Sequence, residues 1–178
     1  IRVDPVEIPF DRRHRYFAFV DPAGGGQDEF TLAIGHSEGN QVIVDLVRAR
    51  KGVPANIVSE YAEILKAYGI REATSDKYAG SWPSDEFARH GIKIEHSPKP
   101  KSDLYLDALA ALNSGRAELP PDERLKHQLL ALERKTSRAG KDSVDHPPGG
   151  SDDRANAVAG IAAQPRSQVR DYAAIVGA

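Results

Sequence analysis

Apolar and polar positions alternate in three successive segments within the first fifty residues. Residues 15–22, RYFAFVDP, alternate aromatic and small residues and end in Asp-Pro, which is typical of a buried strand stopped by proline. Residues 29–37, EFTLAIGHS, and residues 39–50, GNQVIVDLVRAR, continue the alternation on either side of a turn at SEGN. The pattern predicts three antiparallel strands, with Asp21 at the carboxyl end of the first.

The spacing of apolar positions then changes from two residues to three and four. Residues 53–68 predict an amphipathic helix that ends at Gly69. Residues 70–80, IREATSDKYAG, indicate a short strand running to Asp76, residues 81–91 a helix, and residues 92–97, IKIEHS, another strand. Because helices now alternate with strands, we expect the last two strands to join the sheet in parallel.

Three further helices are predicted toward the carboxyl end. They lie in residues 103–115, residues 121–135 and residues 151–164, and the last, SDDRANAVAGIAAQ, begins at Ser151. The polar residues 134–150 between the last two helices indicate a loop or a hairpin. The predicted fold class is α/β, a mixed five-stranded sheet of three antiparallel and then two parallel strands, flanked by helices.

Composition limits the chemistry more than it limits the fold. The 178 residues, 40% of them hydrophobic, are enough for a single domain over residues 1–178 with a core of about residues 15–163. Because there is no cysteine, any metal must have oxygen or imidazole ligands, which favours Mg²⁺, Mn²⁺ or Ca²⁺. The absence of methionine, even at position 1, suggests that the chain begins inside a longer polypeptide.

Charge and hydropathy exclude two classes of protein. No apolar run reaches the roughly 18 residues of a membrane span, and the first twenty residues lack the apolar stretch of a signal peptide, so we expect a cytoplasmic protein that does not contact a membrane. The formal net charge of −2 does not attract nucleic acid globally, so DNA binding would depend on local basic clusters.

Four acidic residues are candidates for a shared site. Asp21 and Asp76 end strands that we expect to be neighbours, and Asp152 and Asp153 open the last helix. Adjacent carboxylates repel each other unless a cation or a proton compensates, and a divalent metal is the economical explanation. Each acid also has a structural interpretation, as the start of an Asx-turn for Asp21 and as favourable first-turn charges behind an N-cap at Ser151 for the pair.

At these residues the chain resembles the carboxyl-terminal nuclease domain of bacteriophage large terminase subunits, which has an RNase H-like fold. The matching motifs are FAFVDPAGGG, EATSDKYAG and GGSDDRANAVAG, and the resemblance covers about residues 15–163. It implies cleavage of double-stranded viral DNA during packaging by two Mg²⁺ or Mn²⁺ ions, in the cytoplasm of the host cell. It also implies an upstream ATPase domain in the intact protein, with the portal protein and the small terminase subunit as partners.

The resemblance assigns roles to individual residues. Asp21 would bridge both ions, and Asp76, Asp152 and Asp153 would complete the two coordination spheres. Many relatives have a histidine or another bulky residue directly before the acid pair, where this chain has Ser151. The sequence therefore leaves open whether His146 reaches the site. The remaining acids are interpreted as solvated or structural, with Asp28 the most plausible exception: Asp28, Glu29, Asp45, Asp142 and Asp145.

Basic residues near these motifs are candidates for DNA contact. The candidates are Lys99, Lys101, Arg134, Lys135, Arg138 and Lys141. On the last helix we expect Arg154 to face solvent, while the small residues Asn156, Ala159, Gly160 and Ala163 pack against the sheet. Tyr78 and Trp82 are interpreted as core residues.

Two alternatives share these patterns. Another RNase H-like nuclease, of the resolvase or transposase type, would have the same acids, and a Walker-type ATPase upstream in the gene would exclude it. A non-catalytic RNase H-like interaction module would bind a partner protein or nucleic acid without cutting it. Such a module usually lacks the acidic residues that this chain retains.

Overall fold

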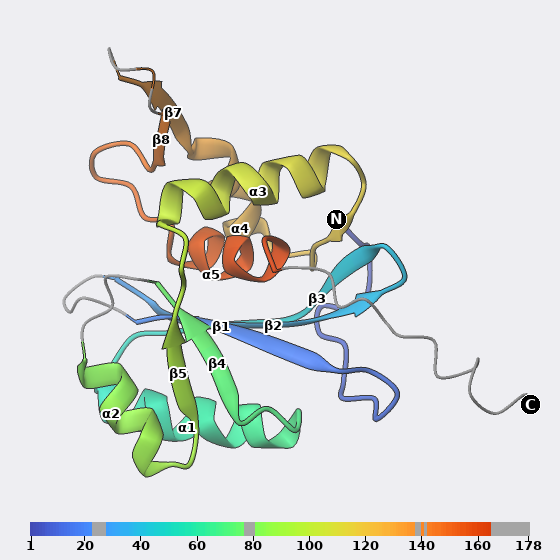
Figure 1. Cartoon of the computed structure of the whole chain (residues 1–178), viewed down its shortest axis with the longest axis vertical. Coiled ribbons are helices and arrows are strands. Elements are labelled where there is room, and N and C mark those ends of the chain that lie inside the picture. Colours follow the sequence, from blue (N-terminus) through green and yellow to red (C-terminus); the bar gives the residue numbers. More distant parts are fainter. Residues whose placement is uncertain (23–27, 77–80, 138–139, 141, 165–178) are drawn as a thin grey trace, which may run out of the picture.

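The computed structural model describes residues 1–22, 28–76, 81–137, 140 and 142–164, and its centre is a six-stranded mixed sheet (Figure 1). The strand order is β5-β4-β1-β2-β3-β6. The strands are β1 (Tyr16–Asp21), β2 (Phe30–Glu38), β3 (Gln41–Arg50), β4 (Glu72–Ser75), β5 (Lys93–His96) and β6 (Ala117–Glu118). The fold class predicted from the sequence is confirmed. The sheet has one strand more than predicted, because the short strand β6 shows no detectable period of apolar residues.

Strand directions follow the prediction. The β1–β2 and β2–β3 pairs are antiparallel, and β4 pairs with β1, and β5 with β4, in parallel. In the β1–β4 register Val20 lies opposite Ser75. The carboxyl ends of β1 and β4 therefore meet at the same edge of the sheet, and the residues that follow, Asp21 and Asp76, lie at that edge.

Helices cover both faces of the sheet (Figure 1). The helices are α1 (Pro54–Ala67), α2 (Trp82–Arg89), α3 (Lys101–Asn113), α4 (Glu123–Ala131) and α5 (Asp153–Ala162). Alternation along β1 separates the two cores, because Ala18 and Val20 join the core under α1 and α2 while Phe19 joins the core under α3, α4 and α5. The five helices predicted from apolar spacing are all present.

Helix α5 lies directly against the sheet because its facing residues are small. A Cβ atom on Gly160 would lie 2.1 Å from the Phe19 ring, so only glycine fits at this contact. The facing strand has a matching position at Gly35, where an added Cβ would lie 2.6 Å from the side chain of Ile161. The close approach fixes the axis of α5 and thereby the place of its first residues.

A hairpin of β7 (Glu133–Thr136) and β8 (Asp142–Asp145) projects from the helical layer above α3 (Figure 1). This outcome confirms the hairpin that the polar segment indicated. It also shortens the preceding helix, because α4 ends at Ala131 and the predicted helical residues 133–135 belong to β7. The side chain of Ser102 ties the hairpin to α3 by accepting a hydrogen bond from Val144 N at 3.0 Å.

Two smaller predictions have other outcomes. Trp82 is 45% exposed at the start of α2, so its interpretation as a core residue is wrong, and Tyr78 lies outside the described residues.

The described helices are all too short or too polar to traverse a lipid bilayer.

Candidate metal centre

Asp21 and Asp76 reach a common cavity from the ends of two neighbouring strands. The cavity has a volume of about 280 Å³ and is called here the acid cavity. Its lining is Asp21, Pro22, Asp28, Asp76, Lys101, His146, Gly150, Ser151, Asp152, Asp153 and Asn156. The four acids predicted from the sequence are therefore together in one cavity, and Asp28 and His146, which the sequence left open, line it as well.

Backbone contacts hold Asp76 in place at the end of β4. Ser97 N donates a hydrogen bond of 2.8 Å to Ser75 O, which keeps β4 and β5 paired to their ends. The Nδ1 atom of His96 lies 3.1 Å from Asp76 O, and because a carbonyl oxygen only accepts, the ring nitrogen is the donor. These contacts come from the end of β5 and the residue after it, so the pairing of β4 with β5 and the His96 side chain together position Asp76.

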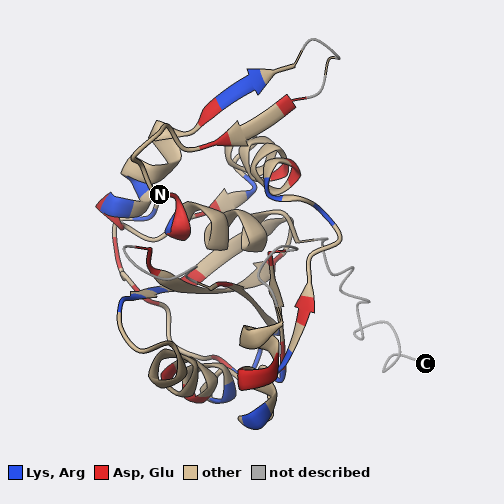
Figure 2. Cartoon of the chain, turned by 90° about the vertical axis from the view of Figure 1, so that its left-hand side faces the viewer, with Lys and Arg blue, Asp and Glu red and all other residues tan. Residues whose placement is uncertain are grey.

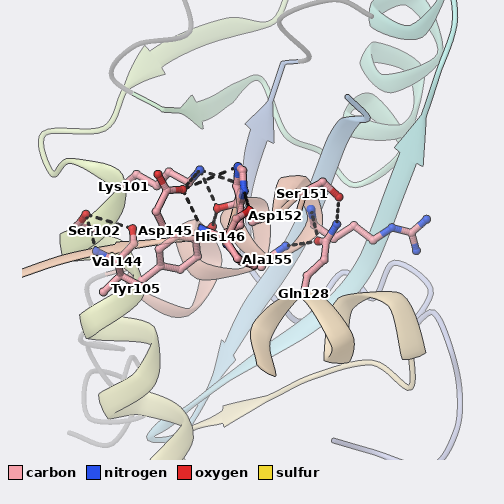
Figure 3. A network of polar contacts seen from close by, with 12 residues as sticks. Lys101, Ser102, Tyr105, Gln128, Val144, Asp145, His146, Ser151, Asp152 and Ala155 are labelled. Atoms are coloured by element: carbon pink, nitrogen blue, oxygen red, sulfur yellow. Dashed lines mark hydrogen bonds and ion pairs between the residues drawn. The ribbon is translucent and has the colours of Figure 1, made fainter. Parts of the chain in front are cut away.

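The first turn of α5 brings Asp152 and Asp153 to the cavity without using them as caps. Gln128 of α4 provides the cap, because its Oε1 accepts from Arg154 N at 2.9 Å and from Ala155 N at 3.1 Å (Figure 3). The same side chain donates to Ser151 Oγ at 3.2 Å. Asp152 is the N-cap residue by position but makes no side-chain capping bond, so the expected N-cap at Ser151 is wrong and both carboxylates are left for other contacts.

Asp152 is buried and already has partners for its carboxylate. It is 4% exposed, and Tyr105 of α3 donates a hydrogen bond of 2.6 Å to its Oδ2. Lys101 Nζ lies 2.7 Å from the same carboxylate (Figure 3). Burial raises the pKa of Tyr105 and the adjacent Asp152 charge raises it further, so the phenol stays protonated and acts as a donor.

Asp153 faces the strand side of the cavity. Its Oδ2 accepts a hydrogen bond of 3.2 Å from Glu29 N. Burial raises the pKa of Asp153, the Glu29 amide lowers it, and the charges of Asp28 and Asp152 raise it again. The carboxylate thus lies among like charges, a surrounding that favours the binding of a cation.

Arg154 does not face solvent as expected from the helical period. Its guanidinium lies 3.2 Å from Glu29 and 2.6 Å from Asp122, and its side chain is 21% exposed. The buried Glu29 also pairs with Arg124 at 3.0 Å. The helical wheel failed here because α4 and the start of β2 cover the side of α5 that would otherwise be in water.

The electrostatics of the cavity favour a divalent cation. Burial raises the pKa of Asp21 to about 8, although a hydrogen bond from Asn156 opposes the shift, and Asp153 and Asp152 add to it. The Oδ1 atom of Asn156 is buried and has no hydrogen-bond partner in the described part of the chain. Carboxylate and amide oxygens with one imidazole are the ligands that Mg²⁺ and Mn²⁺ accept, so the residues present fit such ions.

A second set of donors overlaps the predicted four acids. One ligand atom from each of Asp145, His146 and Asp152 lies within 4.8 Å of the other two. Asp145 belongs to β8 and was interpreted from the sequence as a solvated residue, and its side chain is indeed 69% exposed. Its place beside the cavity comes from the attachment of the hairpin to α3, which has no signature in the sequence.

The cations predicted to contact DNA have different surroundings. Lys101 lines the acid cavity, whereas Lys99 pairs with Asp107 on the surface. In the hairpin Arg134 pairs with Asp142 and Lys135 with Glu133 at 3.0 Å, so this element carries both signs of charge (Figure 2). Arg138 and Lys141 lie outside the described residues. DNA contact by this group stays a prediction.

Comparison with known proteins supports the fold. No family model and no curated protein matches the sequence of the chain. Among solved structures, the large terminase nuclease from thermophilic phage G20c superposes with a TM-score of 0.77 at 18% identity, over 89% of this chain and 86% of that one. The HK97 bacteriophage large terminase gives a TM-score of 0.68 at 14% identity, over 89% of this chain and 41% of that one.

A third neighbour was determined with a metal. A variant of the nuclease domain of the large terminase subunit gp2 of bacterial virus Sf6, with manganese and β-thujaplicinol, gives a TM-score of 0.65 at 13% identity, over 85% of this chain and 89% of that one. The G20c nuclease is also known with bound magnesium. At these identities the likeness establishes the fold, and the predicted resemblance to terminase nuclease domains is confirmed at that level.

Three side chains around the cavity escaped prediction from the sequence. Tyr105, Gln128 and Asn156 lie on helix faces that look like ordinary core positions, and all three are buried. Only the position of Asn156, a polar residue within an otherwise small apolar stripe, gave a signal. The other two act through contacts with α5 from helices elsewhere in the chain.

Proposed function

We propose that the chain is a divalent-metal-dependent endonuclease that cleaves double-stranded viral DNA during genome packaging. The observation that carries the proposal is the convergence of Asp21, Asp76, Asp152 and Asp153 in one cavity at the edge where β1 and β4 end. The neighbours that share the fold are terminase nucleases, several of them determined with metals, which supports the same activity here. The reaction class is phosphodiester hydrolysis.

The residues of the cavity have different roles in the proposed reaction, as ligands of the ions or as supports of those ligands. Asp21 would hold both ions of a two-metal site, with Asp76 and Asp153 as further ligands and Asp152 on the α3 side. Two Mg²⁺ or Mn²⁺ ions, when bound, supply the charge that activates water and stabilises the leaving oxygen. Tyr105 and Gln128 keep the acid pair in place, and the polar lining needs no protein nucleophile.

The biological setting follows from the same proposal. In the intact protein an ATPase domain would precede this one, and the portal protein and small terminase subunit would be its partners in the cytoplasm of the host cell. This chain matches 41% of the HK97 bacteriophage large terminase, so in that protein the same fold lies within a longer chain. Double-stranded DNA would be the substrate.

A plasmid cleavage assay tests the proposal. The purified chain is incubated with supercoiled plasmid and Mn²⁺ or Mg²⁺, beside Asp21→Asn, Asp76→Asn and the exposed α2 control Asp85→Asn. We expect nicked and linear products from the wild type and the control, and rates below about a tenth of wild type from the two cavity variants. Metal-independent cleavage, or wild-type rates in Asp21→Asn with an unchanged circular dichroism spectrum, would contradict the proposal.

A further inference from the structure

The ammonium group of Lys101 lies inside the acid cavity, at the start of α3 (Figure 3). Its Nζ is 2.7 Å from the Asp152 carboxylate and 3.5 Å from Asp145 Oδ1. The side chain is 29% exposed, so one end of it still reaches solvent. The single positive charge of Lys101 is therefore shared between two carboxylates of this region and offsets only part of their negative charge.

The same two carboxylates belong to the donor set that includes His146. Their ligand atoms and that of His146 are within 4.8 Å of one another, which is the spacing of groups that share one ion. His146 Nδ1 lies 2.8 Å from Pro147 O, and since the carbonyl only accepts, Nδ1 carries the hydrogen. The other ring nitrogen, Nε2, lies 4.0 Å from Asp145 Oδ1 and is the atom that can bind a metal.

Lys101 and a divalent ion would compete for one place. Both oxygens of Asp152 are engaged, Oδ1 by Lys101 at 2.9 Å and Oδ2 by Tyr105 at 2.6 Å. An ammonium group and a divalent cation on the same carboxylate would repel each other. The buried Oδ1 of Asn156, without a partner among the described residues, lines the same cavity and adds an oxygen that a cation would satisfy.

We propose that Lys101 is a built-in counter-cation on a metal site formed by Asp145, His146 and Asp152, and that a divalent ion binds there by displacing its ammonium group. The proposal rests on the proposed function for the kind of ion, and it gives the ion on the Asp152 side two ligands, Asp145 and His146, beyond the four acids of the cavity. Lys101 is the first residue of α3 and has a flexible stem, so it can turn outward while the helix stays in place. The two ions then bind with different affinities, and the ion beside Lys101 binds more weakly.

Isothermal titration of Mn²⁺ into the metal-free chain tests the competition. The proteins are wild type, Lys101→Met, Lys101→Arg and the matched control Lys99→Met, whose lysine pairs with Asp107 away from the cavity. We expect the weaker Mn²⁺ site of Lys101→Met to tighten by about tenfold, and that of Lys101→Arg and Lys99→Met to stay within about twofold of wild type. Adding His146→Ala to Lys101→Met should reverse the gain, because it removes a ligand of the same site.

Two outcomes separate the proposals. If wild type and Lys101→Met bind Mn²⁺ with the same affinities, the role of Lys101 is overturned while the nuclease proposal stands. If none of the proteins binds Mn²⁺ and none cleaves DNA, the proposed function fails and the Lys101 inference fails with it.

A measurement on the wild type covers the case in which Lys101→Met does not fold. The ammonium resonance of Lys101 is followed by nuclear magnetic resonance during titration with diamagnetic Mg²⁺. In the metal-free chain we expect a signal slowed in exchange by its contacts with Asp152, and we expect that signal to broaden or vanish as the second ion binds. A resonance unchanged at saturating Mg²⁺ would overturn the proposal.

Discussion

The four acids of the cavity have different surroundings and are not equivalent. Asp152 forms an ion pair with Lys101 and accepts a hydrogen bond from Tyr105, and Asp153 accepts a hydrogen bond from Glu29 N. Asp21 lies between the strand edge and α5, and its pKa of about 8 arises first from burial. In the metal-free chain the proton on Asp21 is therefore the first competitor of an incoming ion.

The pKa of Asp21 predicts a pH dependence for metal binding. Because the folded-state pKa is about 8, above the ordinary 3.8, an ion must displace a proton from Asp21 at neutral pH. We expect Mn²⁺ affinity to rise between about pH 6 and pH 8 and to level off above that range. Calorimetry in two buffers of different ionisation enthalpy measures both the affinity and the proton released.

The stability of the metal-free chain should change in the opposite direction. A raised folded-state pKa gives stability that is fully present below the ordinary value and is lost as pH rises through about 8. Asp21→Asn should remove this loss of stability, while the exposed Asp85→Asn should keep it.

For the prediction on metal binding, an Mn²⁺ affinity that does not vary with pH would show that Asp21 is already ionised or that it is not a ligand.

Among the elements, the amino-terminal turn of α5 controls the geometry of the acid pair. Gln128 caps this turn from α4, and Arg154 is held by Glu29 and Asp122 from two other elements. Gly160 allows the same helix to contact Phe19. The position of the acid pair thus depends on contacts at both ends of α5.

Substitution of Gln128 tests this dependence. Gln128→Ala leaves one buried and one part-buried amide without an acceptor, so we expect a loss of about 1–3 kcal/mol in the free energy of unfolding. Cleavage should fall by roughly ten- to hundredfold, since the acid pair shifts. Gln128→Glu keeps the acceptor beside the helix amino terminus and should stay close to wild type in urea denaturation and in cleavage. Wild-type stability and cleavage in Gln128→Ala would show that the cap has no role.

The accuracy of prediction from the sequence differed between elements for physical reasons. Strands and helices with clear apolar periods were found, and the ends of β1 and β4 correctly placed Asp21 and Asp76 in one cavity. The two-residue strand β6 is too short to have a period. The surroundings of Arg154, Lys101 and Gln128 depend on contacts between segments far apart in the chain, which local patterns do not encode. The expected stripe of α5 does contact the sheet at Gly160, but residues Ala155–Ala162 are all buried, so the period did not separate a buried face from an exposed one.

For the whole molecule, the distribution of charge limits how DNA can bind. The net charge is −2, and Lys99, Arg134 and Lys135 each pair with a carboxylate. Exposed pairs of this kind are weak, so the cations remain available to phosphates, but the neighbouring acids reduce the gain. The acid cavity therefore lies on a surface whose paired cations attract DNA only modestly.

DNA binding by the chain should accordingly be weak, salt-dependent and indifferent to sequence. Without metal we expect a Kd of about 10⁻⁴–10⁻⁶ M at physiological salt, and this Kd should rise steeply with ionic strength. Fluorescence anisotropy with two unrelated duplexes measures this, and Arg134→Ala with Lys135→Ala should reduce the salt slope by at most about two phosphate contacts. Tight binding of one duplex over the other would contradict a backbone-only interface.

We propose that the acids at the edge of the sheet form a divalent-metal site. Anomalous diffraction from crystals grown with Mn²⁺ tests it most directly, because the scattering locates each ion independently of any activity. We predict an anomalous peak in the acid cavity at about 2.1 Å from carboxylate oxygens of Asp21 and its neighbours. An empty cavity at saturating Mn²⁺, or Mn²⁺ bound only at other acidic residues, would overturn the proposed metal site.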